Sequence, residues 1–367
     1  MQIEPFEIER FYERWEFTAE LMLSSSDCES RSVASLLALE PGAGERLLDL
    51  RLGYTEVPGS AELRAAVAAL YEGIEPRHVL TLAAAEEGLF LANHALLSNG
   101  DHAVIESPCY GSAIALARST GAEVSLWRRD PQDGWAPDAD ALEGLLQPNT
   151  RMIYCNSPNN PTGTQMSGAT FERLIELASE RGIVLFSDEV YRGLEHDPAQ
   201  RLPAACERYE RAISLNTVSK SYGLPGLRIG WLVCRDEGLL EQMRALKLYT
   251  TICSSAPSEV LVELALRHSG DLIGASRRLV LDNLPLLDDF LWRRADLLTW
   301  TRPTAGPIGF ARVLADVDVH NWCESIARDA GVLLLPGTVY GVPDHVRLGF
   351  GRANLAEALG RLDEHLG

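Results

Sequence analysis

The sequence predicts an α/β fold with a mostly parallel sheet sandwiched by helices, followed by a smaller α+β C-terminal domain. One observation is that short apolar segments alternate with helix-length segments between residues 79 and 233, at the spacing of βαβ units. Another is that Tyr110, Asn160, Asp188 and Lys220 each stand just after a predicted strand. Because ligands bind at the carboxyl ends of strands in such sheets, these side chains are candidates for one shared site.

The length and composition fit a globular protein of two domains. With 367 residues, 46% of them apolar, the chain can fill one large core and one smaller core. We expect residues 1–45 to form an N-terminal arm and part of the small domain. Residues 46–265 are then the large domain that carries the binding site, and residues 266–367 are the small C-terminal domain.

Charge and residue usage exclude several classes of protein. The net charge is −19, from 33 basic and 52 acidic side chains, which argues against nucleic acid or an anionic membrane as a partner. No apolar run reaches the roughly 18 residues that span a bilayer, and the charged N-terminus lacks the pattern of a secretory signal. The seven cysteines form no C-x-x-C pair, which predicts reduced thiols and a cytoplasmic location. The eight histidines show no ligand-like spacing, so we expect no metal site.

The elements of the N-terminal half follow from periodicity and from cap residues. Apolar residues on one face predict an amphipathic helix at residues 6–23, and a short extended segment is expected at residues 47–51. Ser60 is a suitable N-cap for an Ala- and Leu-rich helix that reaches Tyr71. Beyond it, the expected strands are 79–82, 103–105, 123–127, 152–155 and 183–186, and the expected helices are 83–97, 111–120, 138–146 and 168–180.

The C-terminal half completes the sheet and adds the second domain. Strands are expected at residues 212–215 and 229–233, and helical segments at 236–249 and 257–292, with a break near Ser269-Gly270. The small domain is expected to contain strands 310–314, 332–335 and 345–350, a helix at 319–330, and a last helix from about Asn354.

The most informative stretch is SLNTVSKSYGLPGLRIGW, residues 214–231. A short buried strand is followed by the hydroxyls of Thr217 and Ser219 and then by Lys220, and Arg228 follows a Gly-Leu-Pro-Gly turn. A lysine at a strand end can lose its hydration, which lowers its pKa and makes its amine nucleophilic. Hydroxyls beside a guanidinium suit a phosphate group. Taken alone, the same residues also fit a surface lysine and an arginine in a solvated loop.

A second anion-binding feature is AAAEEG at residues 83–88, where a helix is predicted to begin. A helix N-terminus offers unpaired N–H groups and the positive end of a dipole. Small side chains at Ala84 and Ala85 let an anion approach the backbone, so the N–H groups of Ala85 and Glu86 are candidate phosphate donors.

Three further blocks accompany the lysine stretch: NSPNNPTG at residues 156–163, SDEVY at 187–191 and VRLGF at 346–350. Together the four blocks resemble the class I and II aminotransferases, which are fold-type I enzymes that use pyridoxal phosphate (PLP). They match the NPxNPTG loop, the D-E-x-Y segment, the lysine segment and the arginine strand of that family, in its order. The resemblance covers the chain from about Leu50 to its end. Ala84 is a departure, since the family usually has glycine there, and Glu86 adds an acid beside the expected phosphate.

The resemblance implies a role for each residue near the cofactor ring. Lys220 would form a Schiff base with PLP and later shuttle a proton as acid and base, and Asp188 would pair with the pyridine nitrogen. Asn160 and Tyr191 would donate hydrogen bonds to the ring oxygen. Tyr110 would stack on the ring face.

The phosphate and substrate contacts are implied in the same way. The phosphate would be held by the side chains of Thr217, Ser219 and Arg228 and by the N–H groups of Ala85 and Glu86. Arg347, with Asn160 beside it, would bind the substrate through a bidentate pairing with the α-carboxylate. Tyr54 would reach the phosphate of a neighbouring subunit, although a packed loop tyrosine explains it equally well.

Each of these residues also has a purely structural explanation. Asp188 could cap a turn, and Asn160 precedes a proline in a common turn dipeptide. Tyr191 could belong to the core, and Arg347 could pair with an acid at a strand edge. Their joint occurrence, in one order, favours the cofactor site.

We therefore expect an aminotransferase that moves an amino group between an amino acid and a 2-oxo acid, as a homodimer with a shared active site. The alternative is a specialised PLP enzyme that performs elimination, cyclisation or oxidation, as in relatives such as cystathionine-type lyases and capreomycidine synthase. The Ala84 and Glu86 departures and the acidic loop with Asp27 and Glu29 favour that alternative, with a cationic substrate, although solvated acids or a helix cap also explain the loop. A third hypothesis is a PLP-binding sensor without catalysis.

Overall fold

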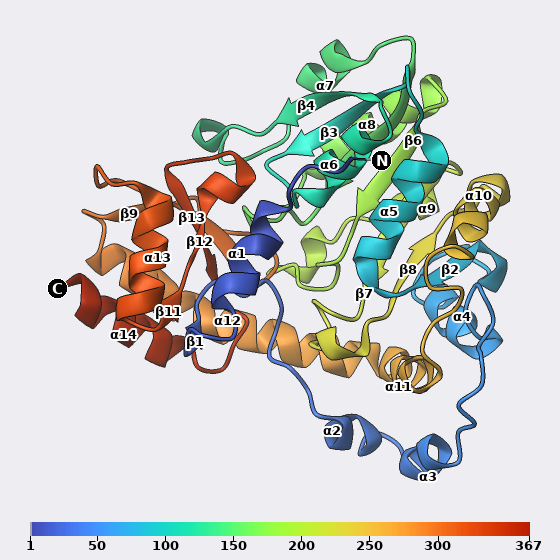
Figure 1. Ribbon diagram of the computed structural model, residues 1–367, viewed down its shortest axis with the longest axis horizontal. Helices are drawn as coiled ribbons and strands as arrows, with labels where there is room; N and C mark the ends of the chain where they lie inside the picture. Colours follow the sequence, from blue (N-terminus) through green and yellow to red (C-terminus); the bar gives the residue numbers. More distant parts are fainter. Residues whose placement is uncertain (1) are drawn as a thin grey trace.

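Seven strands form the central sheet of the large domain in the computed structural model, which describes residues 2–367 (Figure 1). Their order is β2-β8-β7-β6-β5-β3-β4. The strands are β2 (Val79–Leu82), β3 (His102–Ser107), β4 (Glu123–Arg128), β5 (Thr150–Asn156), β6 (Val184–Asp188), β7 (Ala212–Thr217) and β8 (Gly230–Val233). Five neighbours from β7 to β4 pair in parallel, while β8 runs antiparallel to both β7 and β2. The mostly parallel sheet predicted from the sequence is confirmed.

Helices cover both faces of this sheet, because successive side chains of each strand point to opposite faces and both are apolar. Ile105 of β3 packs with α5 (Ala84–Leu96), α6 (Ser112–Ser119) and α10 (Glu237–Lys247). Its neighbour Val104 packs on the other face with α7 (Ala139–Leu145) and α8 (Gly168–Glu180). Further along the sheet, the side chains of Trp231 and Val233 pack with α4 (Ala61–Ala68) and α11 (Ala256–Arg267).

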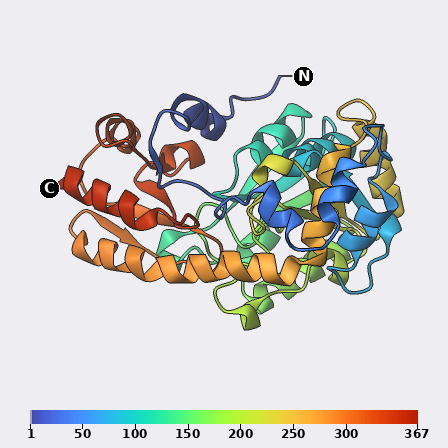
Figure 2. The same cartoon turned by 90° about the horizontal axis from the view of Figure 1, so that it is seen from below.

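The small domain is built on a four-stranded antiparallel sheet in the order β12-β13-β10-β9. Its strands are β9 (Leu298–Trp300), β10 (Ile308–Val313), β12 (Leu335–Pro336) and β13 (His345–Gly349). Helices α13 (Val319–Asp329) and α14 (Leu355–Leu366) pack on it, and α12 (Ser269–Arg293) runs from the large domain to the small one (Figure 2). No helix within residues 2–367 is long and apolar enough to cross a membrane. The expected domain boundaries stay a prediction.

Two elements of the N-terminal region differ from the prediction. The helix expected at 6–23 ends early, as α1 (Glu7–Trp15), and β1 (Leu21–Met22) then pairs in parallel with β11 (Val332–Leu333). This pairing draws Leu21 into the small-domain core, and such a tertiary contact outweighs helical periodicity.

The segment expected to be extended at 47–51 is also different. Residues up to Leu48 belong to α3 (Ala43–Leu48), and no strand follows within that segment. Leu48 is 85% exposed, so its apolar side chain does not mark a buried strand. Two short helices complete the described chain, α2 (Val33–Leu37) and α9 (Ala205–Arg208).

The loop after β5 docks on the small domain through Gly163. Its carbonyl oxygen accepts hydrogen bonds from the N–H groups of Thr304, at 2.9 Å, and Ala305, at 3.0 Å. The backbone of Gly163 has a φ of +68°, and an added Cβ would lie 2.1 Å from the Ile308 carbonyl oxygen and 2.6 Å from Pro303 Cβ. Only glycine therefore fits where this loop meets the small domain.

We predict that Gly163→Ala lowers the free energy of unfolding by about 3 kcal/mol, from the left-handed backbone and the overlap together. Urea unfolding followed by circular dichroism measures this. Gly144→Ala is the matched control, because an added Cβ there meets nothing within 4 Å and lies in a helix. The control should be neutral or stabilising by up to about 1 kcal/mol, and equal stability of both variants would contradict the prediction.

Candidate active site

A cavity of about 310 Å³ lies at the carboxyl edge of the large sheet, where the large domain, the small domain and α1 meet. All the residues to which the family resemblance gives a cofactor or substrate role line it, except Tyr54. They are Ala85, Glu86, Tyr110, Asn160, Asp188, Tyr191, Thr217, Ser219, Lys220, Arg228 and Arg347. The structure brings them together because parallel strands β5, β6 and β7 end at the same edge of the sheet.

Lys220 and Asp188 are two of the ionisable groups that line this cavity. Burial lowers the pKa of the Lys220 amine, whose Nζ donates a hydrogen bond to Ser26 Oγ at 2.9 Å. Burial also raises the pKa of Asp188 to about 6, although its carboxylate accepts hydrogen bonds from Val190 N at 3.2 Å and Tyr154 Oη at 3.0 Å. The site thus favours the neutral form of the Lys220 amine. A positively charged group bound next to Asp188 would stabilise its ionised carboxylate.

Lys220 is one of only two lysines in the chain. The other, Lys247, has no exposed surface and its Nζ donates to the Val57 carbonyl oxygen at 2.8 Å. Lys247 does not line the cavity, so Lys220 supplies the only lysine amine there.

The start of α5 forms one wall of the cavity. Ala84 has a φ of +68°, a left-handed conformation that costs an alanine about 1 kcal/mol and explains why glycine is usual in the family that the sequence resembles. An added Cβ on Gly230 would lie 3.1 Å from Ala84 C and 3.2 Å from Ala85 N. Glycine at that point of β8 therefore allows the strand to pass close to the helix start, where unpaired N–H groups favour an anion.

Hydroxyl groups and one arginine stand beside this helix start. Thr217 Oγ1 and Ser219 Oγ lie 3.0 Å apart, and Arg228 follows with a φ of +53°. Burial raises the pKa of Glu86 to about 7, opposed by a hydrogen bond from Ser112 Oγ at 3.0 Å. A partly neutral Glu86 repels an incoming anion less than an ordinary glutamate would.

Tyr191 shows that the cavity is built for a polar group. Its side chain is 1% exposed and lines the cavity, yet its hydroxyl has no hydrogen-bond partner among residues 2–367. Buried hydroxyls are normally paired, so this one, with the Ser26 hydroxyl near it but no well-formed hydrogen bond, is available to a bound ligand. An orphaned hydroxyl, a buried carboxyl, an amine and an anion-binding helix start together fit the donor and acceptor groups of PLP.

Arg347, on β13, is fully engaged by the protein. Its Nε and Nη2 donate to the Ser24 carbonyl oxygen at 3.2 and 2.7 Å, and Nη2 also donates to Tyr12 Oη at 2.5 Å. Its Nη1 donates to Asn160 Oδ1 at 3.0 Å and to the Tyr340 hydroxyl. The side chain is 1% exposed, which makes it a buried cation with a complete set of partners.

Tyr110 and Asp27 also line the cavity, and each is held by a contact within the chain. The hydroxyl of Tyr110 donates to Glu9, and its ring meets the ring of Phe6 edge-on with centroids 4.8 Å apart. Asp27 lines the cavity and pairs with Arg352 at 2.8 Å.

Two of the predicted residues lie away from the cavity. Glu29 does not line it and is exposed, which fits the explanation of a solvated acid, and its carboxylate accepts a hydrogen bond from Ala353 N at 2.8 Å. Tyr54 is 95% exposed and also lies outside the cavity of its own chain.

Four polar residues of the site were missed in the sequence. Ser26, Tyr12 and Tyr340 contact Lys220 or Arg347, and Tyr154 contacts Asp188. Tyr154 lies in an apolar strand and Tyr12 in an amphipathic helix. Ser26 is next to Asp27, and Tyr340 is seven residues from Arg347, but no local pattern shows that either reaches the site.

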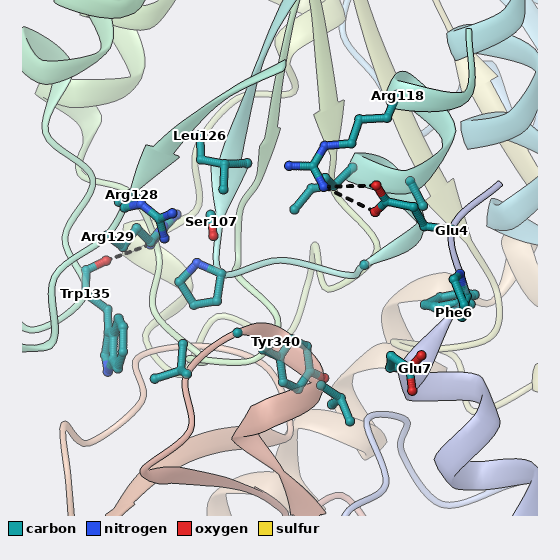
Figure 3. Close-up of a pocket in the computed structure, with 18 of the residues that line it drawn as sticks. Glu4, Phe6, Glu7, Ser107, Arg118, Leu126, Arg128, Arg129, Trp135 and Tyr340 are labelled. Carbon is teal, nitrogen blue, oxygen red and sulfur yellow. Dashed lines mark hydrogen bonds and ion pairs between the residues drawn. The ribbon is translucent and has the colours of Figure 1, made fainter. Parts of the chain in front are cut away.

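A second cavity, of about 450 Å³, lies between the N-terminal segment, α6 and the small-domain turn η5 (Gly337–Tyr340) (Figure 3). Tyr340 lines it while the Tyr340 hydroxyl contacts Arg347 in the first cavity. Figure 3 shows Glu4 of the N-terminal segment reaching across to Arg118 of α6, an ion pair of 3.2 Å. The N-terminal segment thus closes over both cavities.

Comparisons with known proteins agree with the four sequence blocks. The family model described as aminotransferase class I and II matches residues 28–362. Capreomycidine synthase from Streptomyces vinaceus is 33% identical over 366 residues, which cover 96% of this chain and 91% of that protein.

Solved structures give the same result. A PLP-dependent aminotransferase from Streptococcus suis superimposes with a TM-score of 0.94 at 31% identity, covering 100% of this chain and 98% of the other. The PLP-dependent cyclase OrfR superimposes with a TM-score of 0.91 at 29% identity, covering 100% and 98%.

We predict that Asp188→Asn stabilises the ligand-free protein in a pH-dependent way. Because the folded-state pKa of Asp188 is raised from 3.8 to about 6, folded protein keeps a proton that the unfolded chain has released between these values. Stability therefore falls as pH rises through this window, by about 3 kcal/mol in total. Urea unfolding should show the variant more stable than the parent by about that amount near pH 8 and by little near pH 4.

The exposed Asp316→Asn variant controls for the loss of a carboxylate elsewhere. A stability difference for Asp188→Asn that does not change with pH would contradict the prediction.

Proposed function

Because this chain belongs to the class I and II aminotransferases, a family of PLP-dependent enzymes, we propose that it moves an amino group between an α-amino acid and a 2-oxo acid at the Lys220 cavity. One observation supports the proposal most strongly. Lys220, which supplies the only lysine amine in the cavity, and the buried carboxyl of Asp188 line the same cavity. Burial raises the pKa of Asp188 because its ionised form is poorly solvated. A positively charged group beside it would stabilise that ionised form.

The residues around the cavity would hold PLP by its three polar regions. Asp188 would pair with the protonated ring nitrogen, and the orphaned Tyr191 hydroxyl would donate to the ring oxygen together with Asn160. The phosphate would lie at the α5 start, against the N–H groups of Ala85 and Glu86 and the side chains of Thr217, Ser219 and Arg228. Tyr110 would cover the ring. When bound, the cofactor supplies an aldehyde for the amino group and a ring that accepts electrons.

The chain's own residues would then bind the substrate and move a proton. Lys220, whose lowered pKa favours the free amine, would take the proton from the substrate Cα and later return it. Ser26 Oγ, 2.9 Å from the Lys220 Nζ, would orient that amine. Arg347 would bind the substrate α-carboxylate. The small domain and α1 would exclude water from the reacting atoms.

A cyclisation or elimination on a cationic amino acid is the second candidate function. It is supported by the similarity to a capreomycidine synthase and to a PLP-dependent cyclase. Glu9, Glu16 and Asp27 add an acidic wall to the cavity, and burial together with these neighbours raises the pKa of Glu16. Product analysis separates the two functions. Transamination releases a 2-oxo acid without free ammonia, whereas elimination also frees ammonia and cyclisation gives a ring.

We further propose a homodimer in which Tyr54 completes the neighbouring site. Tyr54 is one of several exposed apolar side chains on two loops of the chain. Leu52, near Tyr54, is 81% exposed, and Tyr249, on the second loop, is 89% exposed. The two loops that carry them are joined by a hydrogen bond of 3.1 Å from Thr55 Oγ1 to the Ser254 carbonyl oxygen. Burying such a surface against a second copy would remove it from water.

We predict that Lys220→Ala lowers amino-transfer activity by at least about a hundredfold, because proton transfer at Cα loses its base. The assay is formation of 2-oxo acid from a panel of amino acids by protein loaded with PLP. In the parent protein, borohydride reduction followed by peptide mass spectrometry should place the cofactor on Lys220 and not on Lys247. Label on Lys247, or full activity in the variant, would overturn the assignment.

We predict that Leu52→Asp converts a dimer into monomers and weakens PLP binding, since a charge cannot be buried in an apolar contact without large cost. Sedimentation velocity and a PLP titration measure the two effects. Phe17→Asp is the matched control, because Phe17 is 91% exposed and lies outside this surface. A monomeric parent protein, or a dimeric Leu52→Asp variant, would contradict the proposed dimer.

A further inference from the structure

Arg347 has no hydrogen-bond donor left for a substrate. A guanidinium carries five N–H groups, and the structure gives it five acceptor contacts, two to Ser24, two to Asn160 and Tyr340, and one to Tyr12. A carboxylate can therefore bind Arg347 only if one of these partners gives way. The identity of that partner decides how substrates enter the cavity.

Three of the four partner residues are held firmly. The Ser24 carbonyl belongs to a segment whose neighbour Leu23 accepts a hydrogen bond from Gly349 N at 2.8 Å, next to Arg347 itself. Asn160 and Tyr340 are buried and bonded to each other, with Tyr340 Oη donating to Asn160 Oδ1 at 3.0 Å. Moving any of them would disturb a residue that is buried in the protein, whereas Tyr12 is only partly buried.

Tyr12 is the exception, because it lies on the short helix α1 and lines the cavity from there. Its ring stands 5.9 Å from the Arg347 guanidinium carbon, and its hydroxyl donates to the Ser24 carbonyl oxygen at 2.9 Å. The helix spans nine residues, of which only Ile8 and Phe11 are buried.

Apart from these two residues, α1 and the segment before it are attached by the contacts of Glu9 and Phe6 with Tyr110 and by ion pairs near the surface. One ion pair joins Arg14 to Glu324. The other joins Glu4 to Arg118 (Figure 3). Exposed pairs of this kind stabilise by about 1 kcal/mol or less each. Tyr12 is thus the partner of Arg347 that costs least to remove.

We propose that Tyr12 is a specificity-determining residue, whose hydroxyl holds the place on Arg347 that the substrate α-carboxylate takes. This rests on the proposed function, in which Arg347 binds that carboxylate. Binding exchanges a neutral phenol for a charged carboxylate, which makes the stronger hydrogen bond with a guanidinium. The exchange lets the buried cation stay paired both before and after substrate enters. Ligands without a carboxylate at this point cannot displace Tyr12.

The test is the affinity of the PLP-loaded protein for 2-methylalanine, which has an α-amino group and an α-carboxylate but no α-hydrogen to lose. Calorimetric titration should show that Tyr12→Phe binds it roughly tenfold more tightly than the parent, because one Arg347 N–H is freed. The KM for reacting amino acids should fall in parallel, with the change in KM rather than in kcat. A purely structural role for Tyr12 would change affinity in the opposite direction.

Two matched variants complete the experiment. Tyr209→Phe removes a tyrosine hydroxyl that contacts the Ala178 carbonyl oxygen outside the cavity, and its affinity should equal that of the parent. Arg14→Gln loosens α1 at an exposed ion pair without touching Arg347, so it should also tighten binding, by about twofold. If Tyr12→Phe proves unstable, this second variant carries the test.

The outcomes distinguish the inference from the proposed function. Arg347→Gln should lose 2-methylalanine binding, and retained binding would overturn the role of Arg347 itself. If Arg347→Gln loses binding while Tyr12→Phe shows unchanged or weaker affinity, Tyr12 does not hold the carboxylate position and the inference is overturned alone.

Discussion

The burial of the Arg347 guanidinium is the constraint on which the site depends. Removing a cation from water costs several kcal/mol unless every donor finds an acceptor. The acceptors come from three regions of the chain: Tyr12 and Ser24 near the N-terminus, Asn160 in the large domain and Tyr340 in the small domain. The hydrogen bonds of Arg347 therefore fix the positions of these three regions relative to one another. The cavity is the space that they enclose.

The opposite side of the cavity is fixed by a second buried network at the strand ends. Glu106 and Arg129 form an ion pair with both side chains fully buried, and Glu106 also accepts from Asn156 N at 2.8 Å. Asn156 then accepts from Asn160 N at 2.7 Å and donates to the Asp188 carbonyl oxygen at 3.0 Å. The ends of β3, β5 and β6 are thus cross-linked by side chains, which holds the Asp188 carboxyl at a defined position beneath the cavity.

The fold and the site could be predicted from the sequence where they depend on local patterns, and not where they depend on contacts between distant residues. Asp188 ends an apolar strand and Lys220 comes shortly after another, so the alternation of strands and helices predicts both the parallel sheet and the gathering of these residues at one edge. The helix expected at residues 6–23 was too long, because its end is set by the pairing of β1 with β11, about 310 positions away in the chain. Tyr12 lies 335 positions from Arg347, and Ser26 lies 194 from Lys220. Such contacts depend on how the domains close, which no local pattern encodes.

The scarcity of lysine has a consequence for any reagent or enzyme that targets amines. Lys247 has no surface that solvent can reach, and Lys220 is partly buried and lines the cavity. Acylating agents, crosslinkers or acetyl-transferring enzymes therefore find no lysine on the outer surface of the described chain. Among its lysines, the one that such chemistry can reach in the folded protein is the residue on which its activity would depend.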